Sequence, residues 1–273
     1  MALAESGFVL GVRPVSGLLP HERVIPANVQ RIASEVVKDG VQKDPIIIDR
    51  ESAAVLDGMH RLAAFGKLDI ENVVCCSVDY SSKTVSLKRW ARVYSIPRGE
   101  GLSRALGATG VSRRVTLAEA FDSLDQRKSG VAILTSDAAY LPYANGSLEH
   151  AFAAVDEFDS ISERDGWKRQ FVPEDDVDIA LQESRNSVVL VWRLTKDDVV
   201  TAAKTGRLFP CKTSMHVIDP RPVAVNFPIE ELKKATSATL QQKLGGRVEK
   251  LMPPGSVYEG RRYKERLLLL NSN

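Results

Sequence analysis

The chain has 273 residues, 44% of them hydrophobic, and a formal net charge of only +2. This length and composition predict a globular protein of one large or two smaller domains, and they exclude a disordered or fibrous chain. The near-neutral charge gives no general reason to expect a nucleic-acid or membrane partner. No apolar run approaches the roughly 18 residues of a membrane span, residues 1–10 lack the pattern of a secretion signal, and the cysteines have neither a disulfide nor a zinc spacing. We therefore expect a soluble, cytoplasmic protein.

A helix followed by two strands is predicted early in the chain. Asn28 is expected to cap the helix and Gly40 to end it. The apolar face of this helix is expected to hold Val29, Ile32, Ala33, Val36 and Val37. Residues 45–49 (Pro-Ile-Ile-Ile-Asp) predict a buried strand, and residues 53–56 predict a second one.

The stretch around which the chain is organised is residues 55–64, Val-Leu-Asp-Gly-Met-His-Arg-Leu-Ala-Ala. Two apolar residues end a strand, Asp57 and Gly58 make a tight turn, and a helix begins near Met59. Such a helix terminus presents backbone N–H groups and the positive end of a dipole, and Arg61 adds a two-pronged donor, so the turn predicts a phosphate site. The alternative is structural: Asp57 caps the helix, Gly58 permits the turn, and the basic side chains are solvated.

Residues 72–80 predict another buried strand, and residues 85–94 predict a strand with alternating faces. The alternation places Trp90 on an otherwise polar face, together with Lys88, Arg92 and Tyr94. Trp90 is then either an amphipathic surface residue or a ring that lines the mouth of a pocket. The strand pattern does not choose between these two interpretations.

The second half of the chain predicts further α/β structure without an internal repeat. Helices are expected over residues 117–128, 147–162 and 196–204, and strands over residues 131–135 and 187–194. The stretch between Ser95 and Val115 is rich in Gly, Ser and Arg, which predicts a long loop or a domain junction. We therefore divide the chain into two predicted domains, residues 1–95 and residues 96–273.

Residues 206–213 (Gly-Arg-Leu-Phe-Pro-Cys-Lys-Thr) look like a phosphate-binding P-loop but depart from it. Cys211 stands where the second glycine belongs, and Pro210 removes a backbone N–H group. Donor side chains are nevertheless crowded in and after this segment, namely Lys212, Thr213, Ser214, His216 and Arg221. The segment is either a solvated loop or a loop that closes over an anionic substrate.

Several short motifs, taken in order, resemble the ParB/sulfiredoxin-like nucleotide-binding module. They are residues 19–22 (Leu-Pro-His-Glu), 24–26 (Val-Ile-Pro), 40–45 and 56–61. In that superfamily a Gly-x-x-Arg turn at the start of a helix holds nucleotide phosphates, which implies that role here for Gly58, Met59, His60 and Arg61. The resemblance covers the predicted first domain and implies an α/β (α+β) fold, in which a second α/β lobe closes over the active site.

Beyond that module the chain resembles the free serine kinases. The resemblance adds residues 209–216, Arg221 with Pro222, Pro228, and the C-terminal pattern of Gly260, Tyr263 and Leu267. It implies an enzyme that uses Mg2+ and moves a phosphoryl group from ADP or ATP to free L-serine. The product, O-phospho-L-serine, would serve cysteine synthesis, and the choice between ADP and ATP stays open.

The same resemblance implies roles for individual residues. Glu22 matches the catalytic glutamate, the candidate base for the serine hydroxyl, and Asp57 matches an acidic residue at the reacting phosphate. No cluster of side chains predicts a direct metal site, so Mg2+ would be held through the phosphates, with Asp57 as a candidate ligand. On the substrate side the resemblance implies Trp90, Lys212, Thr213, Ser214, His216 and Arg221. Cys211 departs from the family pattern, in which a second proline or another non-reactive residue is expected.

The leading alternative is a ParB-like, nucleotide-dependent DNA-binding partition or regulatory protein. Such proteins usually follow the module with a basic helix-turn-helix region, whereas the second half of this chain contains strands and is nearly neutral. A nucleic-acid partner is therefore not expected, and the sequence is silent on oligomeric state. Sulfiredoxin chemistry requires a cysteine in the Gly-x-His-Arg turn, where this chain has Met59. A nuclease would require clustered metal ligands, which the sequence does not offer.

Overall fold

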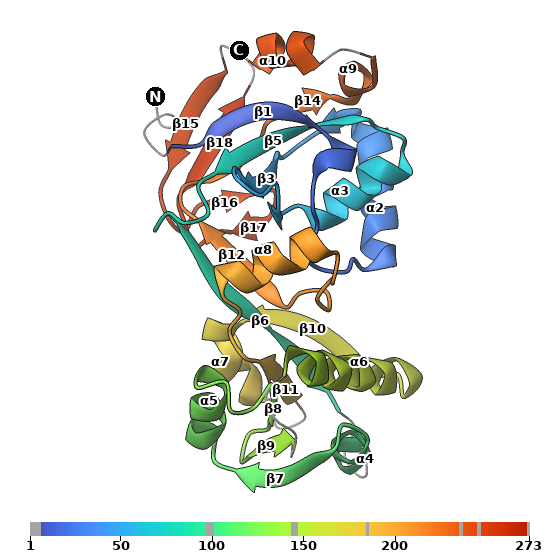
Figure 1. Ribbon diagram of the computed structural model, residues 1–273, viewed down its shortest axis with the longest axis vertical. Coiled ribbons are helices and arrows are strands. Elements are labelled where there is room, and N and C mark those ends of the chain that lie inside the picture. Colours follow the sequence, from blue (N-terminus) through green and yellow to red (C-terminus); the bar gives the residue numbers. More distant parts are fainter. Residues whose placement is uncertain are drawn as a thin grey trace. The chain divides into compact units, whose positions relative to one another are not determined.

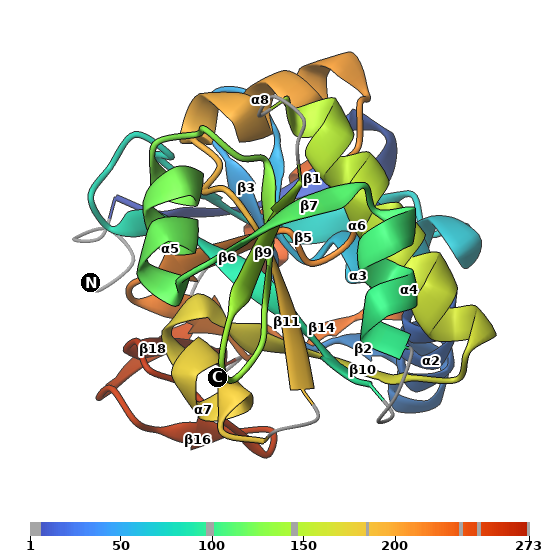
Figure 2. The same ribbon diagram turned by 90° about the horizontal axis from the view of Figure 1, so that it is seen from below.

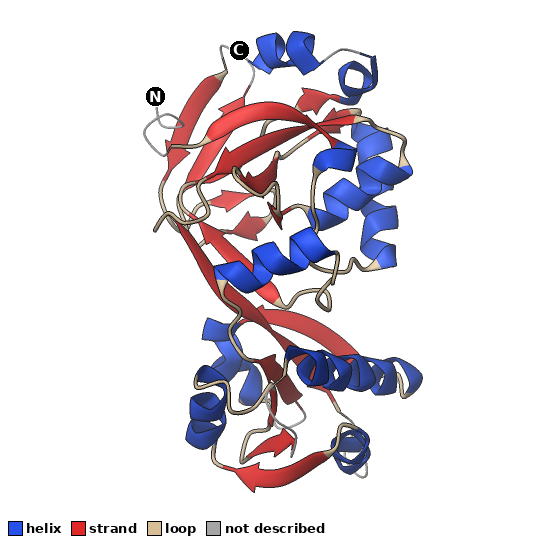
Figure 3. Ribbon diagram, in the orientation of Figure 1, coloured by secondary structure: helices blue, strands red, loops and turns tan. Residues whose placement is uncertain are grey.

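A computed structural model describes residues 7–96, 101–142, 147–183, 186–234, 237–244 and 247–271. Helices and strands are mixed along the whole of this range (Figure 3). The chain forms two compact units, and each unit draws on more than one segment of the sequence. The first unit comprises Met1–Ser86, Lys196–Cys211 and His216–Asn273, and the second comprises Leu87–Thr195 and Lys212–Met215.

The first unit is built around a four-stranded sheet with the order β1-β5-β3-β4. Its strands are β1 (Val9–Pro14), β5 (Asn72–Val78), β3 (Ile46–Asp49) and β4 (Val55–Asp57). β3 and β5 run parallel, and the two outer pairs are antiparallel. Every residue of β3 is buried, as is typical of an inner strand that is covered on both faces. The three strands predicted for this region are confirmed, with ends that differ by one or two residues.

The helix α2 (Pro26–Asp39) begins earlier than the sequence predicted. Ile25 is its cap residue, and Pro26 occupies the first turn, where the missing N–H group would have had no helical partner. Asn28 therefore lies inside the helix, and its prediction as the cap was wrong. Gly40 ends the helix in the left-handed conformation, with φ 67°, which confirms the predicted end.

The buried face of α2 is narrower than predicted. Val29, Ala33 and Val36 are buried, but Val37 is 69% exposed. Each residue advances a helix by about 100°, so Val37 falls beyond the apolar stripe. α2 packs beside α3 (Met59–Lys67), which starts at the predicted residue (Figure 1).

C-terminal segments complete the core of the first unit. One buried cluster joins side chains from both parts of the chain: Ile46, Phe65, Val225, Phe227, Leu232 and Leu240. The elements that supply the later residues are β14 (Phe227–Pro228), which pairs with β2 (Val41–Gln42), and the helices α9 (Ile229–Lys234) and α10 (Ser237–Leu244). The first unit therefore extends past the boundary expected at residue 95, because these apolar side chains cover its sheet. The functional division into residues 1–95 and 96–273 stays a prediction.

The first unit also holds the remaining C-terminal elements. These are α8 (Lys196–Thr205), which confirms the predicted helix, a sheet of β13 (Arg221–Val223), β18 (Leu267–Asn271) and β15 (Val248–Met252), and the pair β16 (Val257–Tyr258) and β17 (Arg261–Arg262). A short 3-10 helix, η1 (Val15–Gly17), follows β1.

The second unit is organised on the long strand β6 (Val85–Ser95), in a sheet with the order β10-β6-β11-β8-β9-β7, to which β12 adds by pairing with β6. The other strands are β7 (Val111–Val115), β8 (Val131–Leu134), β9 (Ala139–Pro142), β10 (Lys168–Pro173), β11 (Asn186–Val191) and β12 (Ser214–Ile218), of which Ser214 and Met215 belong to this unit and the rest to the first. The helices are α4 (Gly101–Ala108), α5 (Leu117–Asp125), α6 (Leu148–Arg164) and α7 (Val177–Leu181), with the 3-10 helix η2 (Glu174–Asp176). α4 and α6 pack side by side (Figure 2).

Of the two alternatives predicted for the stretch between Ser95 and Val115, a long loop or a domain junction, the long loop was wrong. This stretch contains the helix α4 and the strand β7, while residues 97–100 lie outside the described residues. Ala105 of α4 belongs to the buried cluster of the second unit, so packing against α6 stabilises a helix that glycine-rich composition did not predict. The other helices and strands predicted for this unit are confirmed with shifted ends.

The polar face predicted for β6 was also wrong. Arg92 and Tyr94 are buried, because β10 and β11 flank this strand and α6 covers it. Tyr94 packs on Phe158 with ring centroids 4.6 Å apart, and Nε of Arg92 lies 3.7 Å from Oδ2 of Asp159. Arg92 can be buried because the carboxylate of Asp159 compensates its charge. This face of β6 is therefore buried, although the alternation of residue types predicted an exposed face. Within the described part of the chain, no helix has the length and apolar character needed to cross a membrane.

Candidate active site

The start of α3 has the geometry of an anion site. Gly58 precedes the helix with φ 102°, a conformation that glycine adopts without strain. A Cβ atom there would lie 3.1 Å from Nη2 of Arg61, so glycine also lets the Arg61 side chain fold back over the turn. The first N–H groups of a helix have no partner within the helix, so the turn presents donors at the positive end of the α3 dipole. Gly58, Met59, His60 and Arg61 thus stand together at one helix terminus.

Asp57, the last residue of β4, is held by two arginines. Its Oδ2 accepts hydrogen bonds from Nη2 of Arg61 and from Nη1 of Arg221, each at 3.1 Å. Arg61 also donates to the carbonyl oxygen of Pro45 at 2.9 Å, and Nε of Arg221 donates to Oε1 of Glu265 at 2.5 Å. Burial by itself would lower the pKa of Arg221, but the carboxylates of Asp57 and Glu265 outweigh burial and raise that pKa above its ordinary value. The Arg221 guanidinium therefore stays charged beside Asp57.

A second cluster buries Glu22 with two histidines. Glu22 is 4% exposed, and its Oε1 lies 3.8 Å from Nε2 of His21. The His21 ring meets the His216 ring edge to face at 5.5 Å between centroids, and Nε2 of His216 lies 2.7 Å from the hydroxyl of Tyr80. Phe209 donates its backbone N–H to the carbonyl of His21 at 2.9 Å. The segment that resembled a P-loop therefore lies beside Glu22.

Both buried histidines are neutral near neutral pH. Burial lowers the pKa of His21, and this effect exceeds the opposing effects of the Glu22 carboxylate and of a hydrogen bond with the backbone of Val55. Burial likewise holds the pKa of His216 well below its ordinary value, and His21 adds to the lowering. A neutral imidazole has one donor and one acceptor nitrogen, so these rings orient their neighbours rather than supply charge.

The two clusters are joined through His216. Its backbone carbonyl accepts a hydrogen bond from Nη2 of Arg221 at 2.7 Å, while its ring contacts His21. The first unit therefore connects the candidate base Glu22 to the carboxylate of Asp57 through one continuous set of contacts.

His60 links the starts of the helices α2 and α3 by a hydrogen bond. Its Nε2 accepts a hydrogen bond at 3.0 Å from the backbone N–H of Ile25, the cap residue of α2. Because Nε2 accepts, Nδ1 carries the proton in the neutral ring. The imidazole therefore links the starts of α2 and α3, and only its Nδ1–H can donate to a phosphate.

Trp90 and Lys212 contact each other in the second unit. Nζ of Lys212 lies 4.8 Å from the centroid of the Trp90 ring, which is a cation–π contact, and Trp90 donates its backbone N–H to the carbonyl of Thr213 at 3.3 Å. Lys212 has φ 57°, an uncommon conformation for lysine. Thr213 and Ser214 are buried. Trp90 is half-buried with a cation on its face, so it is more than a solvated surface ring.

A cavity of about 190 Å³ opens beside Arg61. Phe65 of α3, residues 41–44 and several side chains of α2 line it, including the apolar Ile32 and the carboxylate of Glu35. Apolar side chains of Ile32, Val36, Val41 and Phe65 lie in this wall among charged and polar ones, at the turn that the sequence predicts to bind phosphate.

No group of three or more His, Cys, Asp or Glu side chains is arranged to hold a metal ion in the described residues. Magnesium bound to a nucleotide needs only one or two carboxylates, together with phosphates and water. Asp57, whose side chain is 43% exposed at the phosphate turn, meets that requirement. The residues present therefore fit a Mg2+ ion that arrives with the nucleotide.

Three residues of this network were missed by sequence reasoning. His21 lies in the motif of residues 19–22, for which the sequence predicted no role of the histidine. Tyr80 was predicted only as the end of a strand. Glu265 carried no signal, because its partner Arg221 is 44 positions away. Tyr80 also gave no cue, because it stands between Asp79 and Ser81 after the end of β5.

Comparison with solved structures defines the class of fold. The structure of a free serine kinase variant in complex with ADP matches with a TM-score of 0.69 and 20% sequence identity, over 82% of this chain and 93% of that one. The chain therefore has the free serine kinase fold, which confirms the predicted α/β architecture. No protein-family model matches the sequence.

Comparison with curated proteins confirms the resemblance to free serine kinases. An ATP-dependent L-serine kinase of Staphylothermus marinus is 25% identical over 232 residues, which cover 80% of this chain and 89% of that protein. An ADP-dependent L-serine kinase of Thermococcus kodakarensis is 22% identical over 219 residues, or 78% and 88% of the two chains. A ParB-like protein of Sulfolobus acidocaldarius is 36% identical, but over only 28% of this chain and 38% of its own length. The comparisons thus favour the serine kinases over the ParB-like alternative.

Proposed function

We propose that this protein is a free L-serine kinase, which transfers a phosphoryl group from ADP or ATP to the hydroxyl of L-serine. One observation supports this proposal above all: a buried glutamate and an arginine-held aspartate at a phosphate turn belong to one network, in a chain similar to L-serine kinases along most of its length. A role of the product in cysteine synthesis and a cytoplasmic location stay predictions.

The nucleotide is expected to bind with its phosphates at the start of α3 and its nucleoside in the cavity beside Arg61. Backbone N–H groups of residues 58–61 and the helix dipole would face the phosphates. Phosphoryl transfer depends mainly on positioning and on positive charge around the transferred group, which Arg61 supplies. When Mg2+ is bound, with Asp57 as its protein ligand, it neutralises charge on the phosphates.

Glu22 is the proposed base. The serine hydroxyl oxygen forms a bond to the terminal phosphorus, the bond from that phosphorus to the bridging oxygen breaks, and the hydroxyl proton passes to the Glu22 carboxylate. AMP leaves if the donor is ADP, and ADP leaves if the donor is ATP. The similar proteins include both donor types, so either nucleotide is a candidate.

The serine carboxylate needs donors. His216 and Arg221 are the candidates in the unit that holds Glu22. Trp90, Lys212, Thr213 and Ser214 belong to the second unit, where the Lys212 ammonium lies over the Trp90 ring, and a contact of these residues with serine stays a prediction.

Phosphorus NMR tests the proposal directly. The purified protein with Mg2+ and either ADP or ATP should produce a phosphoserine signal only when free L-serine is present, and the nucleotide that supports the signal identifies the donor. The same mixture with Glu22→Gln is the matched control and should produce little signal. Nucleotide turnover that ignores serine and responds to DNA would instead support a ParB-like switch protein.

A further inference from the structure

Tyr80 is a buried tyrosine that none of the proposed catalytic steps uses. It follows β5, is 4% exposed, and places its hydroxyl 2.7 Å from Nε2 of His216. Lys196 of α8 lies over the ring, with its Nζ 5.1 Å from the ring centroid, and donates to the Tyr80 carbonyl. The phenol therefore has a partner at its hydroxyl and a second one over its ring.

His216, the partner of Tyr80, touches both halves of the network. Its ring packs at 5.5 Å on His21, the residue next to Glu22, and its backbone carbonyl accepts from Arg221, which binds Asp57. A rotation of the His216 imidazole would therefore disturb its contact with His21, the residue that precedes the proposed base Glu22.

We propose that Tyr80 is a positioning residue for phosphoryl transfer: its hydroxyl holds the His216 ring in one orientation, and this ring, packed on His21, keeps the neighbouring Glu22 in place. The inference rests on the proposed kinase function. A phenol suits the task, because its O–H both donates and accepts and so completes either tautomer of a neutral imidazole. Tyr80 touches neither substrate nor nucleotide in this scheme and acts only through His216.

The test compares Tyr80→Phe with Tyr94→Phe. Each variant removes one buried phenol hydroxyl and keeps the ring, and Tyr94 donates to Asp159 in the other unit. Tyr80→Phe should lose more thermal stability than Tyr94→Phe, because it removes the hydroxyl next to Nε2 of the buried His216, whereas Oδ1 of Asp159 keeps Arg169 at 2.6 Å. Tyr80→Phe should lower kcat about tenfold with little change in the nucleotide dissociation constant, whereas Tyr94→Phe should leave kcat unchanged. Equal kcat values for the two variants would overturn the proposal.

A second measurement needs no turnover and separates this inference from the kinase function. NMR signals of the imidazole nitrogens are recorded for the ligand-free wild type and for Tyr80→Phe. The His21 signals should shift together with those of His216, because the two rings are in contact. A shift confined to His216 would overturn the positioning role. Absence of phosphoserine formation by the wild type would instead remove the proposed function and leave the ring coupling to be judged by this spectrum.

Discussion

Nη1 of Arg221 lies 3.1 Å from Oδ2 of Asp57, although the two residues are 164 positions apart in the sequence. The C-terminal part of the chain thus supplies a charge partner for Asp57, the acidic residue before the start of α3. Arg221 also donates to Glu265, so the side chains of Asp57, Arg221 and Glu265 form one ion-pair network. The Arg221 side chain in this network is buried.

Glu265→Gln tests whether that buried arginine depends on its second carboxylate. Removing one partner of a buried ion pair leaves an incompletely compensated charge, so the free energy of unfolding should fall by about 2–4 kcal/mol. Urea denaturation measures the change. Glu259→Gln is the control, because Glu259 is 59% exposed and 3.9 Å from Lys43, and its loss should cost less than about 1 kcal/mol. Equal costs would mean that the Arg221 pair contributes nothing beyond a surface contact.

Gly58→Ala should weaken both stability and nucleotide binding. Alanine at a positive φ costs about 1–2 kcal/mol, and the new Cβ would also press on Arg61 at 3.1 Å. Gly40→Ala separates the two effects, because Gly40 has φ 67° and nothing within 4 Å of a Cβ. Titration calorimetry with ADP or ATP should show weaker binding for Gly58→Ala alone. Unchanged binding by that variant would mean that the phosphates lie elsewhere.

Arg61→Ala is expected to weaken nucleotide binding at least tenfold, roughly the contribution of one charge-assisted contact. Arg61→Lys keeps the charge but loses the planar fork, so it should recover only part of the affinity. Lys67→Ala, in the last turn of the same helix, is the control and should bind as the wild type does. Thermal melts of all three variants identify any loss of folding, because Arg61 also bonds to Pro45 and Asp57.

Glu22→Gln should reduce kcat about a hundredfold or more, because the amide cannot accept the serine proton. The side chain keeps its size, so nucleotide affinity and the unfolding temperature should change little. Glu230→Gln, on α9 with its side chain 68% exposed, is a matched change of charge away from the base and should leave kcat unchanged. Turnover comparable with that of the wild type would rule out Glu22 as the base.

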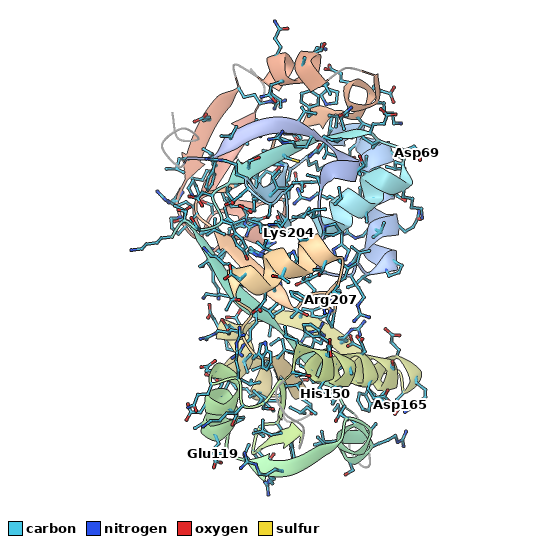
Figure 4. All side chains as sticks on the ribbon, in the orientation of Figure 1. Asp69, Glu119, His150, Asp165, Lys204 and Arg207 are labelled. Carbon is cyan, nitrogen blue, oxygen red and sulfur yellow. The ribbon has the colours of Figure 1, made fainter. Side chains whose placement is uncertain are left out.

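Acid should destabilise the folded chain through its two buried histidines. The pKa of His21 is lowered and that of His216 is held well below 6.5, so below that pH the unfolded chain binds protons that the folded chain does not. The free energy of unfolding should therefore fall as pH drops below about 6.5, by up to about 1.4 kcal/mol per pH unit for each histidine that stays neutral. His216→Gln should flatten this dependence. His150→Gln, an exposed site on α6 (Figure 4), should leave it unchanged.

The sequence by itself determined the parts of this protein that are encoded within a few residues. The apolar run of β3, the Asp-Gly turn and the start of α3 follow from local hydrophobicity and from the freedom of glycine to adopt positive φ. Gly40 likewise marked the end of α2. The order of these short elements was also enough to predict the fold and the resemblance to serine kinases.

Only the tertiary structure decided which distant side chains meet. The pairings of Asp57 with Arg221 and of Tyr80 with His216 leave no local pattern, because they exist only once the C-terminal segments pack on the N-terminal sheet. Packing also overrode local composition in α4 and buried Arg92 on a strand face that alternation marked as exposed. Burial and charge compensation act between residues brought together by the fold, so a sequence read a few residues at a time does not contain them.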